Sequence, residues 1–377
     1  MDMDITIFDD TRPYYDHEIP AAIERISANK YFPLMLNYLF PDTDITSFIA
    51  AFKNIKTVNE FQIQIMYNAI WSIVNKSSSG LTHSGFDKLS NEKKAMFIGN
   101  HRDILLDSAI LQILLKDNNL ETSEITFGSN LMINEFVIDI GKMNKMFKIV
   151  RGGNIRDFYR NSMHVSAYMR YAITEKAQSV WIAQRNGRTK NGDDKTEMAV
   201  LKMFALSSTK SFVPNLLDLN ITPLVISYEY EPCDFLKTAE LYVSRYQKYE
   251  KAPNEDLNSI IQGVTQWKGN IHLAVCEAIT KKELETCDVF DKNEKFQQLS
   301  HIIDKRIYGN YKIYKTNYMA YDMLMKTDKY AKHYSKKQQS EFETYMNNGL
   351  ENIEGEHEEL KNIFLDIYAN PLKNKEL

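Results

Sequence analysis

The chain has 377 residues, of which 44% are hydrophobic and 25% charged, and its formal net charge is −4. This balance is typical of a folded globular protein with a sizeable core, and so small a net charge gives no indication of nucleic-acid binding. No run of about eighteen apolar residues predicts a membrane-spanning helix, and the acidic start, MDMDITIFDD, lacks the pattern of a secretory signal.

The three cysteines, Cys233, Cys276 and Cys287, are odd in number and have no CxxC spacing. They predict neither a disulfide framework nor a zinc site, and they favour a reducing, cytoplasmic location.

Residues 1–77 are expected to form an N-terminal helical region. Residues 31–40 are rich in aromatic and aliphatic side chains, and residues 61–74 carry apolar side chains at helical spacing. Such helices either pack on their own core or dip into a bilayer, where Trp, Tyr and Phe favour the interface. Residues 76–80, KSSSG, are interpreted as a linker to the next region.

From residue 78 the pattern changes to short apolar strands that alternate with helices. The expected strands are residues 95–99, 124–128, 179–184 and 221–227, and the expected helices are residues 104–115 and 196–206. This alternation predicts an α/β fold whose sheet is largely covered by helices on both faces. The α/β core is placed at residues 78–235, and residues 236–377 are expected to form a charged, helical C-terminal region.

One segment, residues 97–107, places a histidine at a strand-to-helix junction with carboxylates close behind it. Asp103 is positioned to cap a helix that begins at Ile104, and Asp107 then falls in its first turn. A carboxylate that holds Nδ1 of His101 would leave Nε2 free to take a proton from an alcohol. The alternative is a buried histidine without a catalytic role.

Arginine is concentrated in the middle of the chain. Seven of the eleven arginines lie between positions 102 and 188, whereas lysine supplies most positive charge elsewhere. The planar guanidinium is suited to bidentate binding of phosphate or carboxylate, although some of these arginines could lie on solvated helix faces. Arg151 precedes two glycines, and Arg188 lies in the turn after an expected strand, where open α/β sheets bind ligands.

The order of four segments resembles the glycerolipid acyltransferase family, which includes glycerol-3-phosphate and 1-acylglycerol-3-phosphate acyltransferases. The four segments are Asn100-His101 through Asp107, Phe147 to Arg151, Asn186-Gly187-Arg188-Thr189, and the proline-bearing strand from Ile221 to Ile226. The resemblance covers roughly residues 78–230. It implies that His101 and Asp107 are catalytic and that Arg102, Arg151, Asn186, Gly187, Arg188 and Pro223 bind substrate.

The resemblance also implies a reaction without metal or cofactor. His101 would deprotonate an acceptor hydroxyl, which then attacks the thioester of an acyl-CoA or acyl carrier protein. The acceptor would be a glycerol phosphate or a lysophosphatidate-type lipid, held through its phosphate by Arg151 and Arg188. Such an enzyme of phospholipid biosynthesis would be expected to be cytoplasmic and to associate peripherally with the inner face of the membrane.

Two departures from the family pattern keep alternatives open. Five residues separate His101 from Asp107 instead of four, so Asp107 stays beside the ring only if the extra residue lies in a non-helical turn; otherwise Asp103 could orient it. Asn186 replaces the family's glutamate. The alternatives are an acyltransferase acting on a lyso-aminolipid, whose carboxylate the arginines would bind, and a lipid-binding relative without activity.

Overall fold

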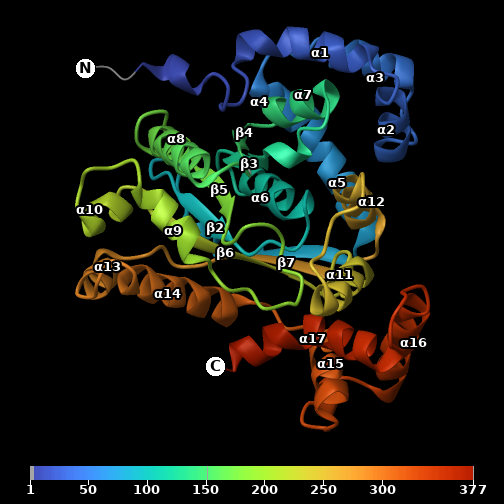
Figure 1. Cartoon of the computed structure of the whole chain (residues 1–377). Helices are drawn as coiled ribbons and strands as arrows, with labels where there is room; N and C mark the ends of the chain where they lie inside the picture. The colour runs from blue at the N-terminus through green and yellow to red at the C-terminus, as the bar shows by residue number, and fades with distance from the viewer. Residues whose placement is uncertain (1–3, 151, 377) are drawn as a thin grey trace.

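The computed structural model describes residues 4–150 and 152–376, and its centre is one seven-stranded sheet (Figure 1). The strand order is β1-β7-β6-β2-β5-β3-β4. Five strands run parallel to one another, while β7 is antiparallel to β6 and carries β1 parallel to itself. The strand bounds are β1 Gly80–Ser84, β2 Met96–Gly99, β3 Glu124–Gly128, β4 Met146–Ile149, β5 Val180–Ala183, β6 Ile221–Tyr228 and β7 Asn270–Val275.

The α/β class predicted from the sequence is confirmed, and the four expected strands correspond to β2, β3, β5 and β6. Three strands were not predicted: β1, β4 and β7. The error at β7 matters most, because this strand lies in the region expected to be only helical and occupies the sheet between β1 and β6. The α/β core therefore extends past residue 235, at least to Val275.

Helices surround the sheet and continue beyond it at both ends of the chain. The N-terminal helices are α1 Ile19–Ala28, α2 Phe32–Leu39, α3 Ile45–Phe52, α4 Val58–Phe61, the π-helical η3 Gln62–Met66, and α5 Tyr67–Ser77. Those between the strands are α6 Leu106–Asp117, α7 Glu135–Met143, α8 Ile155–Thr174, α9 Met198–Ala205, α10 Phe212–Leu217, α11 Asp234–Tyr246 and α12 Glu255–Thr265. The last helices are α13 Lys281–Asp288, α14 Glu294–Asn310, α15 Lys315–Met325, α16 Lys336–Leu350 and α17 His357–Lys375.

Strand β2 shows how the two faces of the sheet are covered. Met96 and Ile98 point into a core shared with α8, α9, α10 and α14, whereas Phe97 points into the opposite core with α5 and α6. Successive side chains of a strand alternate between faces, so a run of apolar residues buries both. The helices that cover the two faces lie on either side of the strands (Figure 1).

The N-terminal helices divide into a buried and an exposed part. In residues 61–74 many apolar side chains, including Phe61, Ile70 and Val74, are buried, while Tyr67 and Trp71 are half-buried, so this segment packs largely on the protein's own core. By contrast, Tyr31, which precedes α2, and Leu34 and Tyr38 on α2 are exposed. Within the described residues, no helix combines the length and apolarity needed to cross a bilayer.

The C-terminal helices reach the sheet through Tyr368 on α17. The Tyr368 hydroxyl accepts a hydrogen bond from the amide of Glu231, just after β6, at 3.0 Å and donates to Asp234 Oδ2 at 2.7 Å. Asn317 on α15 donates in turn to the Tyr368 carbonyl at 2.8 Å. The segment after residue 235 therefore fixes the turn that follows β6.

Acid should weaken the pairing of β1 with β7 through His272. Its ring lies 2.8 Å from Thr82 Oγ1 through Nδ1 and 3.1 Å from Ser84 Oγ through Nε2, and burial, assisted by Lys312 and His83, lowers the pKa of His272 to about 4. The unfolded chain takes up a proton below about pH 6.5, whereas the folded chain resists it. Stability should therefore fall as the pH drops from about 6.5 to 4, and His272→Gln should show a smaller fall in urea-unfolding titrations. Equal slopes for the two proteins would contradict this.

Candidate functional site

The candidate site lies in the turn that joins β2 to α6. Strand β2 ends at Gly99 and the helix begins at Leu106, so the residues between them are not helical. Asp107 Oδ2 accepts hydrogen bonds from the backbone amides of Arg102 at 2.6 Å and Asp103 at 2.9 Å. The same oxygen lies 2.9 Å from Nδ1 of His101. The extra residue between histidine and aspartate is accommodated in the turn, and the pair is formed.

Asp107 is fixed from its other side by Tyr228, the last residue of β6. The Tyr228 hydroxyl donates to Asp107 Oδ1 at 2.7 Å. Burial, and then the charge on Asp107, raise the pKa of Tyr228 well above its usual value, so it remains a protonated donor. With both oxygens engaged, the carboxylate has one orientation available to it.

This geometry selects a tautomer of His101. Oδ2 of Asp107 already accepts from two amides, so Nδ1 of a neutral ring carries the proton and Nε2 presents a lone pair. Within the described parts of the chain, no residue is hydrogen-bonded to Nε2. The side chain is 13% exposed and meets the Trp181 ring edge-on, with centroids 5.6 Å apart. Nε2 is therefore positioned to accept a proton from a bound molecule.

Asp103 has a different role from Asp107. Its Oδ1 accepts from the amides of Leu105 at 2.9 Å and Leu106 at 2.7 Å, and so satisfies the first amide of α6. The helix begins at Leu106, two residues later than predicted, and its N-cap residue is Leu105, not Asp103. Oδ2 packs against Gly263 on α12, where a Cβ would lie 2.0 Å away. Burial and the neighbouring Asp107 raise the pKa of Asp103, and Arg188 opposes that rise. Asp107, and not Asp103, holds the histidine ring.

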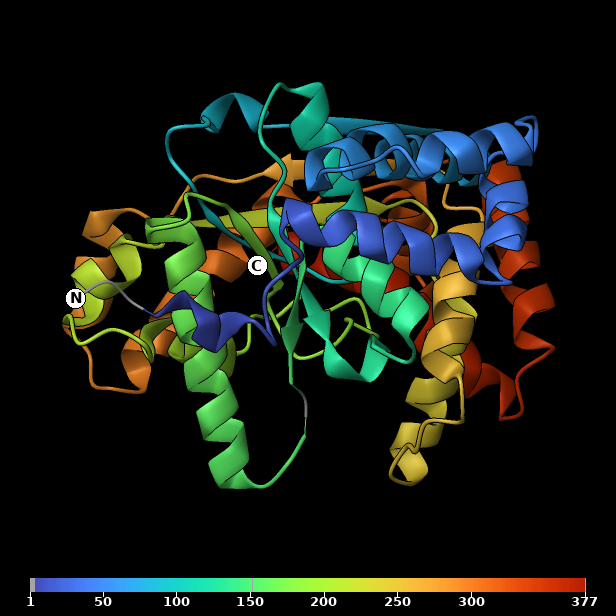
Figure 2. The same cartoon turned by 90° about the horizontal axis from the view of Figure 1, so that it is seen from above.

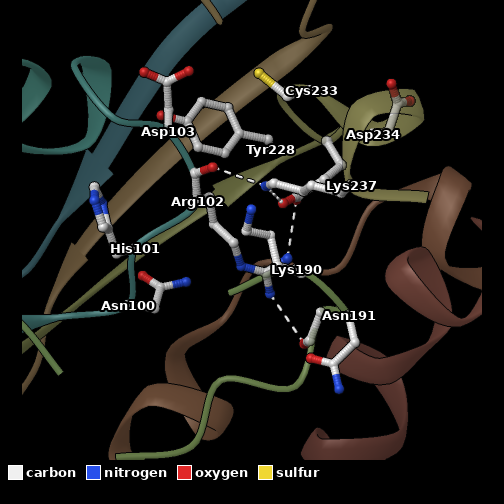
Figure 3. Close-up of polar contacts among 12 residues, drawn as sticks. Asn100, His101, Arg102, Asp103, Lys190, Asn191, Tyr228, Cys233, Asp234 and Lys237 are labelled. Carbon is white, nitrogen blue, oxygen red and sulfur yellow. Dashed lines mark hydrogen bonds and ion pairs between the residues drawn. The ribbon is translucent and has the colours of Figure 1, made fainter. Parts of the chain in front are cut away.

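Arg102 is committed to a buried network of charges (Figure 3). Its guanidinium donates to Asp194 at 2.6 Å through Nη2, to Glu231 at 2.9 Å through Nη1 and to the Gly192 carbonyl at 3.1 Å. All three contacts are to protein acceptors, and the side chain is completely buried. The prediction that Arg102 binds substrate is therefore corrected: this residue supports the turn.

Lys237 on α11 completes the network. Its ammonium donates to Glu231 Oε1 at 2.5 Å and to the Arg102 carbonyl at 2.8 Å. Two buried cations thus face two buried carboxylates, which offsets the cost of removing each from water. Asn100, beside the histidine, donates to Asp194 at 2.9 Å, which links the network to the end of β2.

The turn after β5 contacts the histidine through its backbone. The amide of Thr189 donates to the His101 carbonyl at 2.7 Å, and Gly187 has a φ of +77°, a conformation that favours glycine. Asn186 is exposed, and its amide donates to Glu197 Oε2 at 3.1 Å. The predicted segment from Asn186 to Thr189 therefore lies beside His101.

Arg188 has an unused donor. The residue is 9% exposed, and its buried Nη1 has no hydrogen-bond partner within the described residues. Arg188 lies near enough to the buried Asp103 to oppose the rise in the pKa of that carboxyl, and its unpaired N–H can in addition donate to an anionic group of a bound molecule.

Two further predicted site residues do not add to this geometry. Pro223 lies buried within β6, opposite Ile98 in the register, and its carbonyl accepts from the Cys276 amide at 2.9 Å. It supports the sheet, which corrects its assignment to substrate binding. Arg151 lies outside the described residues. Among the residues that are described, no group of three His, Cys, Asp or Glu side chains is arranged to hold a metal ion.

Comparison with known proteins adds little to this geometry. No protein-family profile matches the chain, and no curated protein sequence matches it. Among solved structures, it is similar to the 1-acyl-sn-glycerophosphate (LPA) acyltransferase PlsC from Thermotoga maritima, with 11% sequence identity and a TM-score of 0.38. The match covers 77% of this chain and 91% of that one. At this level of similarity the comparison assigns neither a family nor an activity.

Several residues of the site were not predicted from the sequence, namely Tyr228, Asp194, Glu231 and Lys237. Tyr228 directly follows the expected strand 221–227, and Glu231 lies three residues further on, so their position at the edge of the sheet was a usable signal. Asp194 and Lys237 give no such signal, because only tertiary packing brings them to Arg102.

Removal of the Arg102 side chain should destabilise the fold. Arg102→Ala leaves buried Asp194 with only the Asn100 amide and buried Glu231 with only Lys237, and breaking a buried pair costs about 3–5 kcal/mol. Arg245 offers a matched control, because its pair with Glu359 at 2.7 Å is at the surface and contributes about 0–1 kcal/mol. Urea unfolding of both variants measures the difference. If Arg102→Ala unfolds like wild type but binds substrate poorly, the assignment of Arg102 to the support of the turn is wrong.

Proposed function

We propose that this protein is an O-acyltransferase in which His101 is the general base. The donor is the thioester of an acyl-CoA or acyl carrier protein, and the acceptor is the hydroxyl of a glycerol phosphate or lysophosphatidate-type lipid. The observation that carries the proposal is the hydrogen bond from His101 Nδ1 to Asp107, which leaves Nε2 with a free lone pair at the edge of the sheet. A base held in this way can act within hydrogen-bond reach of an alcohol.

The reaction balances with these groups alone. Nε2 of His101 takes the proton of the acceptor hydroxyl while the oxygen bonds to the thioester carbonyl carbon. The tetrahedral intermediate then collapses, the carbon–sulfur bond breaks, and the leaving thiolate takes the proton back from the imidazolium. Asp107 stabilises the imidazolium between these two steps.

Arg188 supports an acceptor that carries an anionic group. Its unpartnered Nη1 is buried in the turn whose Thr189 amide contacts His101, so an anion held there would lie next to the base. Asn186 and Gly187 shape the same turn. Arg151, which follows β4, is proposed as a second phosphate ligand from the sequence resemblance alone. The acceptor lipid places the enzyme at the cytoplasmic face of a membrane, in phospholipid biosynthesis.

The first test removes the base. His101→Ala should lower acyl transfer by about 10²–10⁴-fold, the usual contribution of a general base, with little change in stability. Release of free thiol from acyl-CoA in the presence of 1-acylglycerol-3-phosphate gives the rate. Activity above about a tenth of wild type in the purified variant would exclude this role.

A second test separates the two aspartates. Asp107→Asn replaces the acceptor that orients the ring and should reduce turnover more than Asp103→Asn, which only weakens the helix cap. Turnover and the Michaelis constant should be compared for both variants, with circular dichroism as the control for folding. The reverse order would identify Asp103 as the residue that orients His101.

A third test concerns the acceptor. Arg188→Ala should raise the Michaelis constant for the acceptor about ten- to a hundredfold, because a charge-assisted hydrogen bond contributes roughly 1.5–3 kcal/mol. Arg188→Lys should recover part of the affinity, since lysine keeps the charge but lacks the planar fork. Varying donor and acceptor separately decides the matter. If only the Michaelis constant for the donor rose, Arg188 would instead be assigned to binding the phosphates of the donor.

A further inference from the structure

The first turn of α8 exposes large apolar side chains. Ile155 is 90% exposed, and Phe158 and Tyr159 are each 58% exposed. Their spacing of three and four residues places them on one face of the helix. Asn154 caps this turn by accepting from the Asp157 amide at 2.9 Å, so the residues are held in a regular helix although they contact little of the protein.

Exposed cations accompany these apolar residues. Arg156 and Arg160 flank Phe158 and Tyr159, and both are exposed. Arg160 pairs with Asp157 at 3.1 Å, while Arg156 has no ion pair within the described residues. We refer to Ile155, Arg156, Phe158, Tyr159 and Arg160 as the α8 tip. Apolar side chains beside arginines, on a short helical surface, are typical of segments that insert into an anionic lipid interface.

The α8 tip lies at the same edge of the sheet as His101. Strand β4 leads into α8 and runs parallel to β3, which runs parallel to β5 and so to β2. The carboxyl ends of these four strands therefore share one edge. β4 is three strands from β2, so at about 4.8 Å per strand the ends of these two strands are separated by roughly 14 Å.

A second exposed apolar group lies along this edge. Ile133, which follows β3, and Leu257 and Ile261 on α12 are exposed. A hydrogen bond from Asn130 Nδ2 to Asp256 Oδ2, at 2.9 Å, holds the start of α12 next to the end of β3. The start of α8 and the turn between α11 and α12 project beyond the sheet on the same side (Figure 2).

We propose that the α8 tip docks on an anionic lipid surface and brings the edge of the sheet that carries His101 to the interface. Exposed apolar side chains would enter the headgroup region, and Arg156 and Arg160 would meet lipid phosphates. The proposal deepens the proposed function, since it identifies the surface through which the enzyme would reach a lipid acceptor. This surface differs from residues 61–74, whose apolar side chains are largely packed on the core, and it competes with the exposed side chains of α2.

The test is co-sedimentation of the full-length protein with vesicles of phosphatidylcholine, with or without phosphatidylglycerol. Wild type should bind the vesicles that contain phosphatidylglycerol. Ile155→Ser combined with Phe158→Ser should weaken binding by about tenfold or more, without loss of thermal stability, because both side chains are exposed. Arg156→Gln combined with Arg160→Gln should abolish the preference for phosphatidylglycerol.

Leu34→Ser combined with Tyr38→Ser on α2 is the matched control and should bind like wild type. The proposal is overturned if wild type does not bind vesicles, if the α8 double variant binds normally, or if the α2 variant loses binding instead. It is also overturned if sedimentation velocity shows that the α8 variant disrupts a dimer, since the tip would then contact a second copy. His101→Ala should bind vesicles fully, so a failed catalytic proposal stays distinguishable from a failed docking proposal.

Discussion

One carboxylate oxygen, Oδ2 of Asp107, holds the turn between β2 and α6 in place. It accepts from two consecutive backbone amides, those of Arg102 and Asp103, and from Nδ1 of His101. The backbone bonds fix the path of the chain, and the third contact fixes the ring. The same three contacts therefore determine both the shape of the turn and the atom of His101 that is left available. Tyr228 fixes the second oxygen, so the orientation of Asp107 depends on the position of β6.

Much of what supports this turn comes from distant parts of the chain. Arg102 projects away from His101 and joins Asp194, Glu231 and Lys237 in a buried network. Tyr368 of α17 then binds the amide of Glu231, so the last helix of the chain supports the residues behind the histidine. The helical C-terminal region is thus a structural part of the site. If these helices were separated from the α/β core, Glu231 would lose its contact with Tyr368, and the charged network would lose its support on that side.

The sequence predicted the parts of the fold that depend on local pattern. Four strands and the helix after His101 follow from short apolar runs, and the histidine with its two aspartates follows from residue type and spacing. Strand β7 was not predicted, because its pairing with β1 and β6 is set by residues far away in the sequence. The family resemblance assigned Arg102 to substrate binding, and nothing in the local sequence could correct this, because Asp194 and Glu231 reach the arginine only in the folded chain. The family resemblance favoured Asp107 over Asp103, and the observed turn gives the physical reason, because it places Oδ2 of Asp107 beside Nδ1 of His101.

The central claim is that Asp107 fixes His101 with the proton on Nδ1 and a lone pair on Nε2. Nitrogen-15 NMR of the histidine rings measures this directly, since protonated and unprotonated ring nitrogens have distinct chemical shifts. The ring signals of His101 are assigned as those that disappear from the spectrum of His101→Ala. The account predicts the Nδ1–H tautomer at neutral pH in wild type and a mixture of tautomers in Asp107→Asn. A predominant Nε2–H tautomer in wild type would contradict it, because that ring could not accept a proton from a substrate hydroxyl at the open position.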